Sequence, residues 1–159
     1  MKALVQRVLR GQVTVEGRVA GSIGAGYVVL LGVRRDDSDE DAQYLATRTA
    51  ALRIFPDEQG RMNRSIQDVG GSALVISQFT LQADTRKGNR PGFTDAAPPD
   101  LADRLYQAYA GHLRELLGPE RVATGVFRAK MLVEIHNDGP VTIELRSKNE
   151  YAEPRIPNP

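Results

Sequence analysis

The chain has 159 residues, the size of one domain with a single hydrophobic core. It contains no cysteine, which excludes disulfides, thiolate nucleophiles and thiolate metal sites and fits a reducing compartment. The 21 basic and 20 acidic residues leave a net charge of +1, which argues against a protein that coats duplex nucleic acid but permits a local basic rim.

The N-terminal region predicts a soluble, cytoplasmic protein. Gln6 and Arg7 interrupt the first apolar run, so we expect no signal peptide. The longest strongly apolar run, residues 27–33, is much shorter than the roughly 20 residues that a membrane-spanning helix needs.

The first third of the chain is predicted to form strands. Residues 2–10 and 12–16 are rich in valine and leucine, and residues 27–33 are typical of a strand buried on both faces. Glycines stand at turn spacing between these runs: Gly11, Gly17, Gly21, Gly24 and Gly26.

A helix is predicted over about residues 39–52. Ser38 followed by Asp41 resembles a capping box, and the apolar residues that follow share one side of the helix. We interpret the acidic run 36–41 as a helix N-terminus, because it lacks the ligand spacing of a calcium-binding loop.

The rest of the chain predicts strands around a second long helix. A strand end at residues 53–56 and a turn at 57–60 precede a strand over residues 72–82. A basic loop over 83–98 leads into a helix that opens at Pro99 and stops at Gly118-Pro119. Further strands are predicted at residues 121–127, 130–136 and 141–146, and residues 148–159 form an irregular C-terminal tail. Together these elements predict an α+β fold with a mostly antiparallel, barrel-like sheet and two main helices packed on it, in a single domain of residues 1–147.

Several common catalytic centres are excluded by what the sequence lacks. The two histidines, His112 and His136, have no zinc-binding spacing, and we interpret them as a packing residue and a surface residue. The serine-hydrolase elbow and the phosphate-binding P-loop are also missing.

Two segments could carry chemistry. Asn137-Asp138-Gly139-Pro140 separates two alternating runs and predicts a hairpin, although Pro140 cannot donate to a strand ladder, so a functional turn stays open beside a plain one. Ser77-Gln78-Phe79-Thr80-Leu81 ends an apolar strand with several polar side chains. It is either a strand leaving the core or the mouth of a pocket. A Thr80 nucleophile would need a base, and no histidine is near in sequence, so we expect backbone donors to matter more.

The basic loop follows directly after this strand. Arg86, Lys87 and Arg90 could hold phosphates of a nucleic-acid end, and Arg61 and Arg64 could extend the patch. A solvated loop without a ligand is the simpler alternative.

The chain resembles the D-aminoacyl-tRNA deacylase family over about residues 1–147. The similarity rests on Ser77-Gln78-Phe79-Thr80-Leu81, Lys87-Gly88-Asn89-Arg90-Pro91 and Asn137-Asp138-Gly139-Pro140-Val141-Thr142, in that order, and the opening residues 1–8 and the run 28–32 also fit. Five positions depart from the family pattern: Arg128, where a small residue is expected, Lys130, where a less basic one is expected, Gly92 in place of serine, and Gln82-Ala83 in place of an aromatic–glycine pair.

The resemblance implies chiral proofreading in translation quality control: hydrolysis of D-aminoacyl-tRNA and glycyl-tRNA, with rejection of the L-form. It implies an RNA-binding homodimer that acts on the 3′ end of aminoacylated tRNA, with no cofactor and no metal. The implied catalytic strand comprises Ser77, Gln78, Phe79 and Thr80. A cis Gly139-Pro140 motif would enter the partner's pocket, with Arg7 bracing it and Met131 beside the substrate, and Arg86, Lys87 and Arg90 would contact tRNA. A non-catalytic RNA-binding module and a purely structural dimer remain as alternatives.

Overall fold

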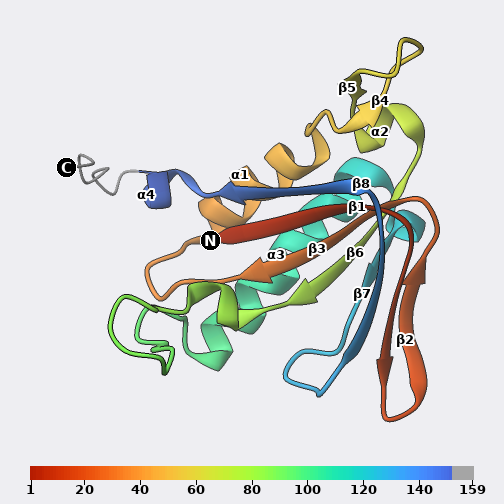
Figure 1. Ribbon diagram of the computed structural model, residues 1–159. Helices are drawn as coiled ribbons and strands as arrows, with labels where there is room; N and C mark the ends of the chain where they lie inside the picture. Colours follow the sequence, from red (N-terminus) through yellow and green to blue (C-terminus); the bar gives the residue numbers. More distant parts are fainter. Residues whose placement is uncertain (152–159) are drawn as a thin grey trace.

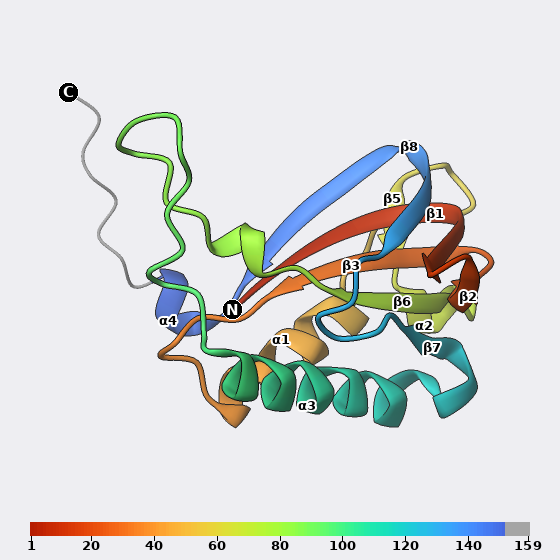
Figure 2. The same ribbon diagram turned by 90° about the horizontal axis from the view of Figure 1, so that it is seen from below.

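The computed structural model describes residues 1–151 as an α+β fold, in which helices cover one face of a strongly curved sheet (Figure 1). Figure 2 shows helices α1 (Asp39–Ala50) and α3 (Pro99–Leu117) side by side on that face. Both helices were predicted. The capping box is confirmed too, since the Ser38 N–H donates to the Asp41 carboxylate at 2.9 Å.

The long strand β1 (Lys2–Val15) organises the sheet. It pairs antiparallel with β2 (Arg18–Ile23), with β3 (Gly26–Gly32) and, along its other edge, with β8 (Leu132–Arg146). A break at Gly11 was expected, but β1 runs through this residue. A Cβ atom at Gly11 would lie 2.6 Å from Val28 Cγ2, so glycine is needed here for close approach rather than for a turn.

The other half of the sheet is parallel, so the prediction of a mostly antiparallel sheet was wrong. β3 pairs in parallel with β6 (Ser72–Ser77), and β6 pairs in parallel with β7 (Val122–Thr124). Parallel neighbours need long crossovers, and the two crossovers here carry α1 and α3. The continuous apolar runs in β3 and β6 fit strands covered on both faces, which is typical of parallel pairing.

The mixed sheet is nearly closed, which preserves the barrel-like part of the prediction. A Cβ atom at Gly21 in β2 would lie 2.7 Å from the Thr124 carbonyl oxygen in β7. The two outer strands of the path β2-β1-β3-β6-β7 therefore approach each other directly (Figure 1).

Buried tyrosines join the sheet to the helices. The Tyr27 hydroxyl donates to the Thr49 carbonyl at 2.9 Å, and the Tyr109 hydroxyl donates to Thr49 Oγ1 at 2.8 Å. Tyr106 donates to the Val75 carbonyl at 2.9 Å, and burial raises the pKa of Tyr106 to about 12. Each phenol thus has a partner in an otherwise apolar core, and a buried phenolate would be disfavoured.

The predicted turn at residues 57–60 connects the paired short strands β4 (Phe55–Pro56) and β5 (Met62–Arg64). The other short elements are α2 (Ile66–Val69), η1 (Phe79–Gln82), η2 (Pro119–Arg121) and α4 (Lys148–Tyr151). The strand predicted over 121–127 is limited to β7. The tail expected to be irregular from residue 148 begins with α4, and its remainder lies outside the described residues. Within residues 1–151, no helix is long and apolar enough to span a membrane.

Candidate functional site

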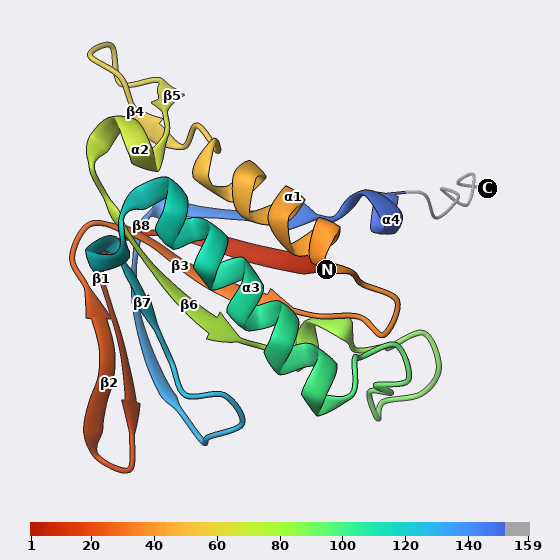
Figure 3. The ribbon, with the colours of Figure 1, turned by 180° about the vertical axis from the view of Figure 1, so that it is seen from behind.

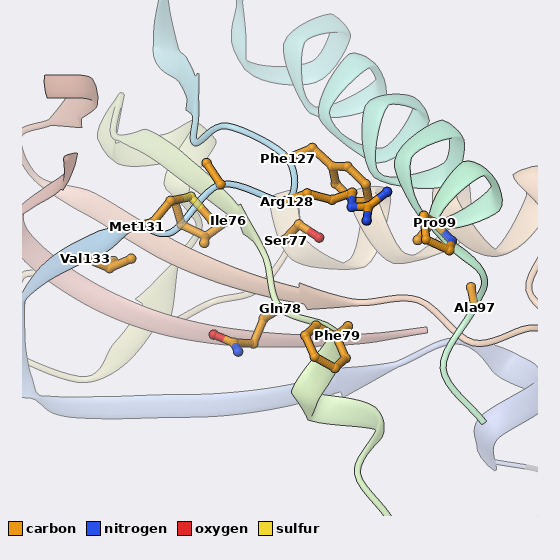
Figure 4. Close-up of a pocket in the computed structure, with 12 residues that line it drawn as sticks. Ile76, Ser77, Gln78, Phe79, Ala97, Pro99, Phe127, Arg128, Met131 and Val133 are labelled. Atoms are coloured by element: carbon orange, nitrogen blue, oxygen red, sulfur yellow. The ribbon is translucent and has the colours of Figure 1, made fainter. Parts of the chain in front are cut away.

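A pocket of about 510 Å³ opens where β6 ends, between the start of α3 and the loop after β7 (Figure 4). This volume is within the usual range for small-ligand sites. The pocket is lined by Ile76, Ser77, Gln78, Phe79, Ala97, Pro99, Ala102, Phe127, Arg128, Ala129, Met131 and Val133. The predicted strand mouth is therefore one wall of a cavity.

The chain turns sharply at the end of β6. The Gln78 N–H donates to the Leu31 carbonyl at 2.7 Å, and the chain then enters the 3₁₀ turn η1. The strand predicted to reach residue 82 thus ends at Ser77, and Thr80 lies on η1. Ser77, Gln78 and Phe79 line the pocket, whereas Thr80 is exposed, does not line it, and accepts a hydrogen bond from Gln78 Nε2.

The turn leaves donors next to the pocket. Phe79 and Thr80 are the first two residues of η1, where a helical turn provides no acceptor for the backbone N–H. Neither N–H has a hydrogen-bond partner among residues 1–151. These two N–H groups, one of them on the pocket-lining residue Phe79, are therefore not used by the fold itself.

The opposite wall is a tight turn after β7. The Ala129 N–H donates to the Val126 carbonyl at 3.2 Å, and Arg128, the third residue of this turn, has φ = 65°. Met131 lies beside it, and a Cβ atom at Gly125 would be 2.6 Å from Met131 Sδ. Met131, which was predicted to bind substrate, lines the pocket together with Phe127 and Ala129, which were not predicted as site residues.

The pocket is nearly free of ionisable groups. Of its described lining residues, Arg128 alone is ionisable, and none is a carboxylate or a histidine. His136 is exposed on β8, and His112 is half-buried on α3, 3.4 Å from the Glu115 carboxylate. Neither histidine lines the pocket, so side-chain base catalysis has no candidate among the lining residues.

The basic loop adjoins the pocket through an aromatic contact. The rings of Phe79 and Phe93 lie edge to face with centroids 5.0 Å apart. Arg86 donates to Asp84 at 2.9 and 2.8 Å, and these hydrogen bonds lower the pKa of Asp84. Lys87 and Arg90 are exposed (Figure 3 shows the loop beyond the N-terminal end of α3).

The Gly139–Pro140 peptide bond is cis, as the resemblance implied, but it does not form a hairpin. β8 is continuous, and it advances five residues from Asn137 to Thr142 while β1 advances two from Val8 to Gln6. The motif is an exposed bulge in a paired strand, because Pro140 cannot donate to the ladder and Gly139 has φ = 125°.

Arg7 supports the bulge from β1. Its Nη1 donates to the Ile54 carbonyl at 2.6 Å, and its Nε lies 3.3 Å from the Asp138 carbonyl and 3.2 Å from Asp138 Oδ2. The Val141 N–H donates to Asn137 Oδ1 at 3.1 Å. Gly139 and Pro140 do not line the pocket of their own chain. Arg7 and the motif are therefore together, and the pocket is elsewhere in the same chain.

Comparison with known proteins gives consistent matches over nearly the whole chain. A family model described as D-Tyr-tRNA(Tyr) deacylase matches residues 4–146. A protein of Anaeromyxobacter dehalogenans named D-aminoacyl-tRNA deacylase is 60% identical over 151 residues, covering 95% of this chain and 100% of that protein. A protein of the same name from Heliobacterium modesticaldum is 58% identical over 148 residues, covering 93% of this chain and 97% of that one.

Two solved structures share the fold. One, named c-Myc DNA Unwinding Element Binding Protein, superposes with a TM-score of 0.88 at 43% identity, covering 92% of this chain and 99% of that chain. The other, described as a probable eukaryotic D-amino acid tRNA deacylase, has a TM-score of 0.78 at 18% identity, covering 91% of this chain and 97% of that chain. At that identity the second match supports the fold alone.

Proposed function

The chain belongs to the D-Tyr-tRNA(Tyr) deacylase family, and from this premise we propose that it hydrolyses the ester bond of D-aminoacyl-tRNA, releasing a free amino acid and tRNA. The observation that carries the proposal is the placement of Ser77, Gln78 and Phe79 on the wall of the pocket, inside the segment that the family model matches. We assign the activity to residues 1–147, in the cytoplasm.

The lack of a carboxylate or histidine among the described lining residues supports a mechanism without a side-chain base. In this proposal the terminal ribose hydroxyl of the tRNA assists cleavage, and the N–H groups of Phe79 and Thr80 stabilise the developing oxyanion. Because Thr80 does not line the pocket, we assign no nucleophilic role to its hydroxyl in this proposal.

Selectivity is proposed to come from a second copy of the chain. The Gly139-Pro140 bulge is exposed and does not line the pocket of its own chain, which suits insertion into a partner's pocket in a homodimer. Backbone carbonyls there would face the chiral centre of the amino acid. An L-side chain would clash with them, whereas D-amino acids and glycine would fit, so glycyl-tRNA would also be cleaved.

The basic loop is proposed to bind the tRNA end. Lys87 and Arg90 are exposed, and the Phe79–Phe93 contact connects their loop to the pocket wall. Arg86 would also bind phosphate, although it is paired with Asp84. Asp84 is only half-buried, so solvent screens this ion pair and the carboxylate competes weakly with phosphate for the guanidinium.

The direct test compares hydrolysis of D-tyrosyl-tRNA and L-tyrosyl-tRNA by the purified protein. We expect turnover of the D-form and little turnover of the L-form. Binding of uncharged tRNA without turnover would instead favour the RNA-binding module. Unchanged activity after replacement of Arg86, Lys87 and Arg90 by glutamine would favour the structural dimer. Thr80→Ala should cost little, and a loss of about 10⁴-fold or more would restore Thr80 as a catalytic group.

Mixed dimers test whether the bulge acts in the partner's pocket. Gly139→Ala should impair selectivity, because its Cβ atom would lie 2.8 Å from Val141 Cγ2 and 3.1 Å from Arg7 Nη2. Gly60→Ala is the matched control, with positive φ and open space around it. When Gly139→Ala and Phe79→Ala chains are mixed, one intact composite site should form and recover selective hydrolysis. No recovery in verified mixed dimers would refute action across the interface.

A further inference from the structure

Arg128 combines three features that the proposed chemistry does not use. It lines the pocket, its side chain is exposed to solvent, and it has no hydrogen-bond or ion-pair partner among residues 1–151. Most other arginines of the site region are engaged: Arg7 bonds to Ile54 and Asp138, and Arg86 bonds to Asp84. A free guanidinium beside a cavity presents several donors with no acceptor.

The backbone fixes where this side chain goes. Arg128 is the third residue of the turn closed by the Ala129 N–H and the Val126 carbonyl, and its φ of 65° is in the left-handed region. A type II turn needs positive φ at this position, where glycine is the usual residue. An arginine here is therefore less favourable for the backbone than glycine would be, and the fold alone gives no reason for it.

The surroundings favour an anion over any other ligand. Figure 4 shows the guanidinium group of Arg128 directed from its turn toward Pro99 at the start of α3. Because the described lining residues include no carboxylate, no internal anion competes for the guanidinium. A planar guanidinium matches the geometry of phosphate oxygens and can bind two of them at once.

We propose that Arg128 is a substrate-binding residue that holds the phosphodiester joining the last two nucleotides of the tRNA. This rests on the proposed function, in which the aminoacylated ribose occupies the pocket. The amino acid is esterified there and has no free α-carboxylate, so this phosphodiester is the nearest group that is anionic in every substrate. The basic loop binds phosphates further from the ester, whereas Arg128 fixes the terminal nucleotide.

Arg128→Gly is the informative variant, since it removes the charge and suits the backbone. We expect KM for D-tyrosyl-tRNA to rise about tenfold, at the low end for a charge-assisted hydrogen bond, with kcat nearly unchanged. The slope of log kcat/KM against log salt should become shallower by about 0.7, the value for one contact to a single strand. The melting temperature should stay equal or rise. Arg128→Lys should restore part of the affinity.

Lys130→Gln is the matched control: it removes one positive charge two residues away, at an exposed side chain that does not line the pocket. It should change KM and the salt slope much less than Arg128→Gly does. Equal effects would show a general field of positive charge and overturn a specific contact. A wild-type protein that hydrolyses no D-tyrosyl-tRNA would refute the proposed function instead, independently of Arg128.

D-aspartyl-tRNA separates two sources of negative charge. A phosphodiester contact predicts the same rise in KM for D-tyrosyl-tRNA and D-aspartyl-tRNA in Arg128→Gly. A loss confined to D-aspartyl-tRNA would mean that Arg128 recognises an acidic side chain, and it would overturn the proposal. So would unchanged KM and salt dependence for both substrates in an active enzyme.

Discussion

Replacing Arg7 by lysine tests how the Gly139-Pro140 bulge is held. The guanidinium contacts two separate segments, the Ile54 carbonyl at 2.6 Å and Asp138 at 3.2 to 3.3 Å. A lysine keeps the charge but has a single ammonium, which cannot reach both segments in the same geometry. The variant should therefore lose one of the two contacts while the net charge stays the same.

The expected magnitude follows from burial. The Arg7 side chain is 12% exposed and Ile54 is buried, so the lost hydrogen bond from a charged donor is worth about 1.5–3 kcal/mol. The Asp138 side chain is 42% exposed, so its ion pair adds less than about 1 kcal/mol. We expect Arg7→Lys to lower the free energy of unfolding by about 2 kcal/mol, a fall in melting temperature of about 4–8 °C for a chain of this size.

Denaturant unfolding measures the loss, and a double-mutant cycle with Asp138→Asn isolates the ion pair. Arg10→Lys is the control, because Arg10 is 54% exposed and 3.9 Å from Glu134. It should stay within about 0.5 kcal/mol of the wild type. An equally small change in the free energy of unfolding for Arg7→Lys would refute the role of Arg7 in bracing the bulge. If bracing matters for selectivity, Arg7→Lys should also raise hydrolysis of L-tyrosyl-tRNA relative to the D-form.

Three further outcomes follow from the core and the pocket rim. Thr49→Val should cost about 1–3 kcal/mol by leaving the buried Tyr109 hydroxyl without its acceptor, and Tyr109→Phe in the same chain should recover part of that loss; a cycle without coupling would contradict this. Burial raises the pKa of Tyr106 from 10.0 to about 12, so the neutral phenol contributes about 3 kcal/mol to the free energy of unfolding below pH 10, and this contribution is lost as the pH rises toward 12. Phenolate absorbance and circular dichroism should therefore change together. Ionisation without unfolding would argue against burial as the cause. Phe93→Ala should remove about 0.5–1.5 kcal/mol of contact with Phe79 and raise KM for D-tyrosyl-tRNA with kcat retained, which steady-state kinetics can check against a loss in kcat.

The sequence predicted the helices and the pocket strand well because their signals are local. The Ser38–Asp41 box and the Pro99 and Gly118-Pro119 boundaries lie within a few residues of the elements they delimit. Strand direction is different, since nothing inside residues 72–77 says whether β3 runs parallel or antiparallel to it. The continuous apolar character of both strands was the available hint, and it indicated burial on two faces without fixing the pairing.

The site was predicted in part for the same reason. Ser77, Gln78 and Phe79 line the pocket as expected, and Gly139-Pro140 is cis as the resemblance implied. The 3₁₀ turn that takes Thr80 off the strand follows the Gln78–Leu31 hydrogen bond, a long-range contact that has no local signature in the sequence. The bulge was predicted as a hairpin because Asp-Gly between alternating runs favours a hairpin turn. The pairing of β8 with β1 on both sides of the motif shows instead that the strand continues.

A pocket whose described lining has no carboxylate or histidine limits what the protein can contribute to ester cleavage. What remains is position and oriented donors, and both depend on rigid elements. The Phe79 and Thr80 N–H groups are held by a turn tied to β3, and the bulge is held by Arg7 across β1 and the segment at Ile54. Under the proposed mechanism, a shift of about 1 Å in either support would misplace the ester even though every lining side chain is retained. Substitutions in these supports should therefore damage catalysis more than removal of the exposed Thr80 hydroxyl does, although none of the supporting contacts reaches the substrate.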